Sequence, residues 1–162
     1  MKKLLLTILI FFILAVSVSI YFLDKYYFIS PIEYKADVII RSDSYGEGFF
    51  AANRSGRRLH NGIDLLAGIG APVFASRAGI VIAATNSRGM GNHVILRHPG
   101  NITTIYGHLA SICVAKGNIV RQKDLIGRVG KTGNADYKGI LPHLHFEVRK
   151  NGVPEDPLEY LP

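Results

Sequence analysis

The 162-residue sequence predicts a mainly β, antiparallel domain preceded by one N-terminal transmembrane helix or signal segment. Three observations lead to this fold class: residues 4–23 carry no charge, all 17 glycines lie between Gly46 and Gly152, and no window of ten or more residues after position 45 has helical apolar spacing. Roughly 120 to 140 residues remain for the domain, which suffices for one core but not for two. The single cysteine, Cys113, excludes an intrachain disulfide scaffold.

The N-terminal segment has the length of a membrane-spanning helix. Lys2 and Lys3 precede the uncharged run Leu4–Leu23, which as a helix would be about 30 Å long, close to the thickness of a bilayer core. Basic residues at the N-terminus predict that the rest of the chain lies outside the cytoplasm. We expect residues 1–23 to be an uncleaved anchor or a cleaved signal, with a buried core helix as the third alternative, and residues 24–45 to be a stalk or linker.

The remaining chain is basic and has the composition of a folded domain. Without Lys2 and Lys3, 17 basic side chains stand against 12 acidic ones. Such a charge favours a polyanionic partner, and outside a membrane this is anionic lipid or a cell-wall polymer rather than nucleic acid. The alternative is that the basic surface serves only solubility.

Short strand-like runs separated by turn residues fill residues 46–162, the expected domain. Asn86–Gly89, Pro99–Asn101 and Asn151-Gly152 have the residue types of turns. The expected strands are Pro72–Ala75, Gly79–Thr85, His93–His98, Asn101–Tyr106, Ile112–Ala115, Leu125–Val129 and Leu144–Lys150. This pattern predicts a compact antiparallel sheet.

Two histidine motifs have the spacing of a site. In an extended His60-Asn61-Gly62-Ile63-Asp64 the first and last side chains point to the same face, although such a pair alone is more often structural. In the run 143–148, alternation places Leu144, Phe146 and Val148 in the core and puts His143, His145 and Glu147 together on the opposite face. Two imidazoles on one strand face favour metal binding or catalysis over packing.

A third motif, Tyr106-Gly107-His108-Leu109, ends a β-rich run beside a glycine. Taken together, the motifs contain enough ligands for zinc, because two histidines and one aspartate leave a fourth position open, as catalytic zinc sites do. Zinc acidifies water and polarises a carbonyl group, so an amide can be hydrolysed without a covalent nucleophile. Such a site also needs a general base and a donor for the oxyanion or the leaving amine, and further histidines can supply both.

The motifs resemble, in order and spacing, those of the lysostaphin-type (LytM-like) zinc endopeptidases of bacterial cell walls. The resemblance covers about residues 41–162 and rests on Arg41-Ser42-Asp43, His60-x-Gly62-Ile63-Asp64, Tyr106-x-His108-Leu109, Pro142-His143-Leu144-His145-Phe146-Glu147 and Asp156-Pro157. It implies a mostly antiparallel β-sheet domain with a groove across the sheet. It also implies cleavage of peptidoglycan stem peptides or cross-bridges, in the bacterial cell envelope.

The resemblance implies a role for each site residue. His60, Asp64 and His145 are the expected ligands of one Zn²⁺ per chain, and His108 and His143 are the expected catalytic histidines. Some members of the family place a tyrosine shortly before the first zinc histidine, but none lies between Phe49 and His60 here. The stretch 134–141 is longer than usual, so we expect Tyr137 and Lys138 to form a groove wall.

Two further features surround the expected site. Arg54, Arg57 and Arg58 form a basic approach that would pair with stem-peptide carboxylates, unless they are only a solvated loop. Glu147 would either hydrogen-bond a zinc-ligating imidazole or form a cross-strand charge pair.

Other functions are compatible with parts of this pattern. A non-catalytic module of the same shape would bind wall peptide or activate another hydrolase, and a latent enzyme would need a protein activator. A cupin-like metal protein also carries a His-x-His pair, but its Glu follows several residues later, whereas Glu147 is two residues after His145. Only cleavage of wall peptides separates these alternatives from a peptidase.

Overall fold

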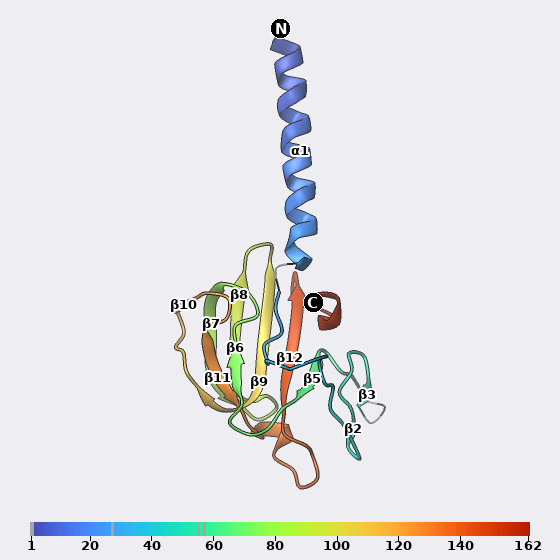
Figure 1. Ribbon diagram of the computed structural model, residues 1–162, viewed down its shortest axis with the longest axis vertical. Helices are drawn as coiled ribbons and strands as arrows, with labels where there is room; N and C mark the ends of the chain where they lie inside the picture. Colours follow the sequence, from blue (N-terminus) through green and yellow to red (C-terminus); the bar gives the residue numbers. More distant parts are fainter. Residues whose placement is uncertain (1, 27, 55, 57) are drawn as a thin grey trace.

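The computed structural model describes residues 2–26, 28–54, 56 and 58–162. It begins with one long helix, α1 (Lys2–Tyr26), which extends away from a β-sheet domain (Figure 1). A run of leucine, isoleucine and phenylalanine without glycine or proline favours this helix. Leu4 to Leu14 expose half or more of their apolar side chains, so the alternative of a buried core helix is wrong.

The structure does not support the predicted membrane anchor. In the described part of the chain, no helix is long and apolar enough to cross a membrane. The prediction of a transmembrane segment in residues 1–23 therefore rests on the sequence pattern alone.

The predicted antiparallel β domain is confirmed. In the described part of the chain its main sheet has nine strands. Six follow the order β10-β7-β8-β9-β11-β6, and β12 adds to β9 and carries β5 and β13 (Figure 1). The elements are β1 (Ser42–Asp43), β2 (Gly46–Glu47), β3 (Asn53–Arg54), β4 (Arg58–Leu59), β5 (Ile63–Leu66), β6 (Pro72–Phe74), β7 (Gly79–Ser87), β8 (Gly91–His98), β9 (Ile102–Ile112), β10 (Ile119–Val120), β11 (Leu125–Val129), β12 (His143–Lys150) and β13 (Val153–Glu155), with short 3₁₀ helices at Gly133–Ala135 and Pro157–Glu159.

Most of the expected strands are present with bounds that agree within two residues, but the strand expected at 101–106 continues to Ile112 as β9. The separate strand expected at Ile112–Ala115 is wrong, because Ile112 is the last residue of the long β9 and residues 113–115 form no strand. Among the described residues, the strands that the sequence did not predict are β1 to β5, β10 and β13. They have only two to four residues, which is too short for an alternating pattern to be recognised.

One long strand changes its neighbour at the place where the site forms. The first part of β9 pairs with β12 as far as Gly107, and its last part pairs with β11 from Leu109 onward. Between them lies His108, with φ of 62°. A positive φ is unfavourable for a residue with a side chain and is concentrated at functional sites.

The segment expected as a stalk packs against the domain from residue 28 onward. Phe28 and Ile32 are buried in the main core. The Phe28 ring meets the Tyr160 ring edge-on, with centroids 5.2 Å apart, and the backbone of Pro31 accepts a hydrogen bond from Phe74 N. Apolar side chains at these positions are better buried than exposed in a free linker.

A chain of buried polar groups crosses the core beside Phe28. His98 donates from Nδ1 to the Ala78 carbonyl over 2.9 Å, and its Nε2 lies 2.8 Å from Thr104 Oγ1. Thr104 contacts the Tyr106 hydroxyl, which donates to Ser76 Oγ. Burial, together with nearby Arg77, lowers the pKa of His98 to about 4, although the hydrogen bond to Ala78 opposes this shift. His98 is therefore neutral in the folded protein at neutral pH.

This pKa predicts a loss of stability in mild acid. The unfolded chain takes up a proton on His98 near pH 6.5, whereas the folded chain does so only near pH 4. Between these values the unfolded state binds more protons, so the free energy of unfolding falls as the pH decreases, by about 3 kcal/mol in total from this residue. Denaturant unfolding of the wild type and of His98→Gln from pH 7.5 to 4 measures it. Equal pH dependence in both proteins would contradict the prediction.

Candidate metal centre

Two paired strands bring the expected metal ligands together. In the antiparallel ladder of β5 and β12, His145 lies directly opposite Asp64. His60 comes from the turn that leads into β5. Directly opposed residues in such a ladder have neighbouring side chains, so the pairing of two strands places residues that are 81 positions apart next to each other.

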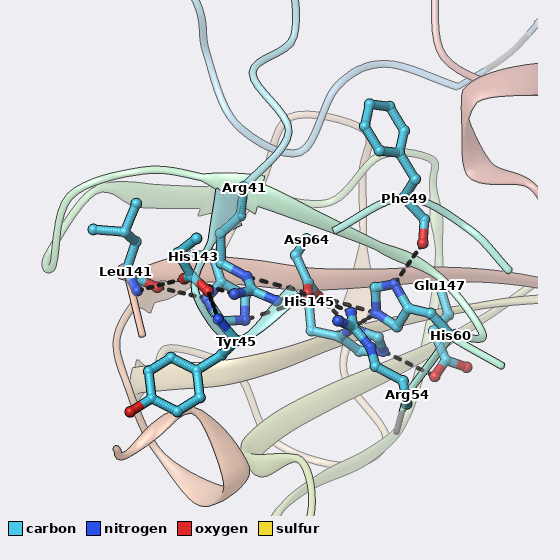
Figure 2. A network of polar contacts seen from close by, with 11 residues as sticks. Arg41, Tyr45, Phe49, Arg54, His60, Asp64, Leu141, His143, His145 and Glu147 are labelled. Atoms are coloured by element: carbon cyan, nitrogen blue, oxygen red, sulfur yellow. Dashed lines mark hydrogen bonds and ion pairs between the residues drawn. The ribbon is translucent and has the colours of Figure 1, made fainter. Parts of the chain in front are cut away.

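Three ligand atoms converge in this cluster (Figure 2). Asp64 Oδ1 lies 2.9 Å from His145 Nδ1 and 3.1 Å from His60 Nε2, and the two nitrogens are 3.0 Å apart. Ligand atoms around a tetrahedral zinc ion at about 2.0–2.1 Å are roughly 3.3 Å from one another. The triangle is therefore within a few tenths of an ångström of the size that zinc requires. All three side chains are buried.

Hydrogen bonds on the outer side of each imidazole determine which atom faces the cluster. His60 Nδ1 donates to the Phe49 carbonyl over 2.8 Å, so Nε2 turns its lone pair inward. His145 Nε2 is 3.0 Å from Glu147 Oε1, which leaves Nδ1 facing Asp64. Three atoms with lone pairs at such short distances repel one another unless a proton or a cation lies among them.

The ionisation of the cluster agrees with a cation site. Burial favours the neutral form of His145, but its hydrogen bonds to Asp64 and Glu147 outweigh burial and raise the pKa of His145 to about 9. Burial likewise opposes ionisation of Asp64, yet the hydrogen bond from His145 and the positive charge of that ring hold the pKa of its carboxyl far below the usual range. The carboxylates thus favour positive charge at His145, and a metal ion held there would take the place of the proton.

His108 and His143 lie beside this cluster. Their rings are 5.1 Å apart, and His108 lies 5.7 Å from the His145 ring. Each donates from Nδ1 to a backbone carbonyl, His108 to Thr132 over 2.8 Å and His143 to Leu141 over 2.7 Å. Nε2 of His143 is 3.8 Å from Asp64 Oδ1.

Both of these imidazoles are neutral near pH 7. Burial, together with the neighbouring His145 and His143, lowers the pKa of His108 to about 3. Burial also lowers the pKa of His143, although Asp64 opposes the shift. A neutral ring that donates from Nδ1 has a free lone pair at Nε2, the form that a general base needs.

The site opens to solvent through a cleft of about 260 Å³. Its walls carry aromatic, apolar and basic side chains, among them Tyr45, Ile140, Arg54, Arg58 and Arg149. Tyr137 does not line the cleft; it is exposed and stacks edge-on against Tyr45. The long stretch 134–141 contributes Asn134, Ala135 and Ile140 to the wall instead of the expected Tyr137 and Lys138.

The predicted basic approach is divided among different contacts. Arg54 Nη2 forms an ion pair with Asp64 Oδ2 over 2.9 Å, whereas Arg58 lines the cleft. Arg57 lies outside the described residues. Tyr45 was not predicted from the sequence as a cleft residue, because it lies before the interval Phe49–His60 that was compared with the family's tyrosine.

Gly62 explains the spacing between the first two ligands. A Cβ atom on this residue would lie 2.2 Å from the Phe146 carbonyl oxygen, on the backbone of β12. Only glycine therefore lets the turn at His60–Gly62 lie against β12 closely enough for His60 to reach His145.

Fold and site define a class: an antiparallel β domain with a buried cluster of three side chains that could hold a metal ion, and two further histidines beside it. The model of peptidase family M23 matches residues 58–157. The chain belongs to peptidase family M23.

Named relatives agree with this assignment. The chain is 44% identical over 101 residues to the DD-carboxypeptidase/endopeptidase Mpg of Neisseria meningitidis serogroup B, a match of 62% of this chain and 22% of that protein. The chain thus corresponds to about a fifth of this relative's length.

Solved structures of similar fold include a zinc-containing peptidase from Vibrio cholerae. It superimposes with a TM-score of 0.65 at 34% identity, over 79% of this chain and 38% of that one. The catalytic domain of lysostaphin from Staphylococcus simulans superimposes with a TM-score of 0.58 at 32% identity, over 72% and 89% of the two chains. The donor set, its size and this similarity identify zinc as the cofactor that fits the site.

The buried Glu147 predicts a measurable effect on metal binding. Its Oε1 hydrogen-bonds to His145 Nε2, and its Oε2 forms an ion pair with Arg149 Nη2 over 2.6 Å. Glu147 therefore fixes the imidazole that presents Nδ1 to the cluster. Glu147→Gln removes the charge but keeps the shape. We expect zinc affinity to fall by about 10- to 100-fold, measured by competition with a chromophoric chelator. Unchanged affinity would show that Glu147 does not orient His145.

Proposed function

We propose that this protein is a zinc-dependent endopeptidase that hydrolyses amide bonds in peptidoglycan stem peptides or cross-bridges. The observation that carries the proposal is the convergence of His60 Nε2, Asp64 Oδ1 and His145 Nδ1, with two neutral imidazoles beside them at the base of an open cleft. Relatives named as peptidoglycan DD-endopeptidases, such as ShyA of Vibrio cholerae, support the choice of substrate.

In this proposal His60, Asp64 and His145 hold one zinc ion per chain. When bound, zinc supplies Lewis acidity, which polarises the scissile carbonyl group and acidifies water. The three side chains leave a coordination position free, as a catalytic site requires. Their outer hydrogen bonds to Phe49 and Glu147 keep the rings in orientation before substrate arrives.

The two remaining histidines move protons. His143 or His108 accepts at Nε2 the proton of the water that attacks the carbonyl carbon. The other stabilises the tetrahedral oxyanion or protonates the leaving amine as the C–N bond breaks, a role that requires a proton on its own Nε2 at that step. The Nδ1 bonds to Leu141 and Thr132 leave both Nε2 atoms available for these transfers.

The substrate also determines where the protein acts. Peptidoglycan lies outside the cytoplasmic membrane, so we propose that the domain acts in the bacterial cell envelope. The basic side chains Arg54, Arg58 and Arg149 at the cleft would attract the carboxylates of stem peptides.

Substitution of the proposed metal ligands and of a proposed catalytic histidine distinguishes loss of metal from loss of proton transfer. With the full chain, we expect His60→Ala and Asp64→Ala to abolish both bound zinc and cleavage. His108→Ala should keep zinc and lose about 10²- to 10⁴-fold in turnover, because only a proton-transfer group is removed. Elemental analysis gives the zinc content, and mass spectrometry of digested peptidoglycan gives the products.

Chelation provides the matched control, since activity lost on removal of zinc should return when zinc is added back. Full zinc and turnover in Asp64→Ala would contradict the ligand assignment. Zinc binding without new amine termini in the wild type would contradict the peptidase and favour a non-catalytic wall-binding or activating module.

A further inference from the structure

A buried arginine connects the metal site with the loop that holds His143. The side chain of Arg41 is 4% exposed. Its Nε and Nη2 donate to Asp64 Oδ2 over 3.3 and 3.0 Å (Figure 2), and its Nη1 lies 2.6 Å from Asp43 Oδ2. One guanidinium group thus bridges two carboxylates, of which one belongs to the metal cluster and the other does not.

The second carboxylate leads to a catalytic histidine. Asp43 Oδ2 accepts a hydrogen bond from Leu141 N over 3.0 Å, and Asp43 Oδ1 accepts one from Tyr45 N over 2.8 Å. The carbonyl of the same Leu141 accepts the Nδ1 proton of His143 over 2.7 Å. An unbroken path of polar contacts therefore runs from Asp64 through Arg41, Asp43 and Leu141 to the ring of His143.

At Asp64, the guanidinium group binds one carboxylate oxygen and leaves the other oxygen facing the histidines of the cluster. Arg41 and Arg54 both contact Oδ2. Oδ1 faces His60 and His145, and it is also the oxygen 3.8 Å from His143 Nε2. With Oδ2 engaged, the carboxylate presents one oxygen to the cluster in a fixed orientation.

The chemistry of this position requires arginine rather than any cation. A buried charge is stable only when it is paired and its donors are satisfied, and here two carboxylates provide the pairing. The planar guanidinium group of Arg41 reaches the two carboxylates through separate nitrogens, Asp64 through Nε and Nη2 and Asp43 through Nη1, whereas the ammonium group of lysine acts as a single point charge. Lysine at this position would keep the charge and lose the bridge.

We propose that Arg41 is a positioning residue, which holds the metal-binding carboxylate of Asp64 and the imidazole of His143 in fixed relation by bridging Asp64 and Asp43. The roles of Asp64 and His143 are those of the proposed function, on which this inference rests. The bridge itself is a property of the folded chain and is testable without metal or substrate.

The first test is hydrogen exchange at the Leu141 amide in the full chain. In Arg41→Lys we expect exchange to be at least about tenfold faster, because the acceptor Asp43 is no longer held and a hydrogen bond to a charged group is weakened. Arg54→Lys is the matched control: Arg54 contacts the same Asp64 oxygen but has no contact with Asp43, so Leu141 exchange should stay at the wild-type rate.

A second variant tests whether the two carboxylates act through one link. Asp43→Asn breaks the Leu141 side of the bridge and leaves the contacts of Arg41 with Asp64 in place. If both substitutions act on one path, Arg41→Lys/Asp43→Asn exchanges no faster at Leu141 than Asp43→Asn alone. Multiplied effects in the double variant would overturn the proposal.

Kinetics on peptidoglycan fragments provide the third readout. In Arg41→Lys and in Asp43→Asn we expect kcat to fall about 10- to 100-fold with KM changed less than about twofold, because the groups that act in the reaction are displaced while the cleft remains. Arg97→Lys, in an exposed position at the far end of β8, should behave as wild type. Wild-type exchange and kcat in Arg41→Lys would overturn the inference. An inactive wild type with faster Leu141 exchange in Arg41→Lys would instead contradict the proposed function and leave the bridge established.

Discussion

The antiparallel pairing of β5 with β12 is the constraint on which the site depends. It sets Asp64 opposite His145, and the absence of a side chain at Gly62 lets His60 reach the same point. Two of the three donors are therefore positioned by the strand ladder, and the backbone of His60 is held by hydrogen bonds with Ala51 and Ala52. Rigid placement of this kind is what a metal site needs, because ligands that are already in position lose little conformational entropy on binding.

Buried charge accounts for much of the remaining architecture. Asp64 contacts two arginines, Glu147 contacts His145 and Arg149, and Asp43 contacts Arg41. Each of these charges would be costly to bury alone, so they occur as a connected network. Within that network His108 and His143 remain neutral and hold their Nδ1 protons on backbone carbonyls. The same cleft thus contains groups suited to holding a cation and groups suited to accepting a proton.

The sequence predicted the long strands and the residues of the cluster, because alternation and motif spacing are local signals. His143, His145 and Glu147 were expected on one face, and all three lie at the site. Tertiary effects were not predictable. Phe28 and Ile32 lie in a segment expected as a stalk but pack into the core. The positive φ of His108 occurs where β9 changes its strand partner. The hydrogen bond from Leu141 N to Asp43 joins residues 98 positions apart. No periodicity in the chain encodes such contacts.

The most direct test of this account is anomalous diffraction at the zinc edge from crystals of the zinc-loaded protein. The account predicts one ion per chain, bound to His60 Nε2, Asp64 Oδ1 and His145 Nδ1, with the Nε2 atoms of His108 and His143 near it but not bonded to it. An ion held by His108 and His143, or by His145 through Nε2 together with Glu147, would contradict the assignment of metal-binding and proton-transferring residues.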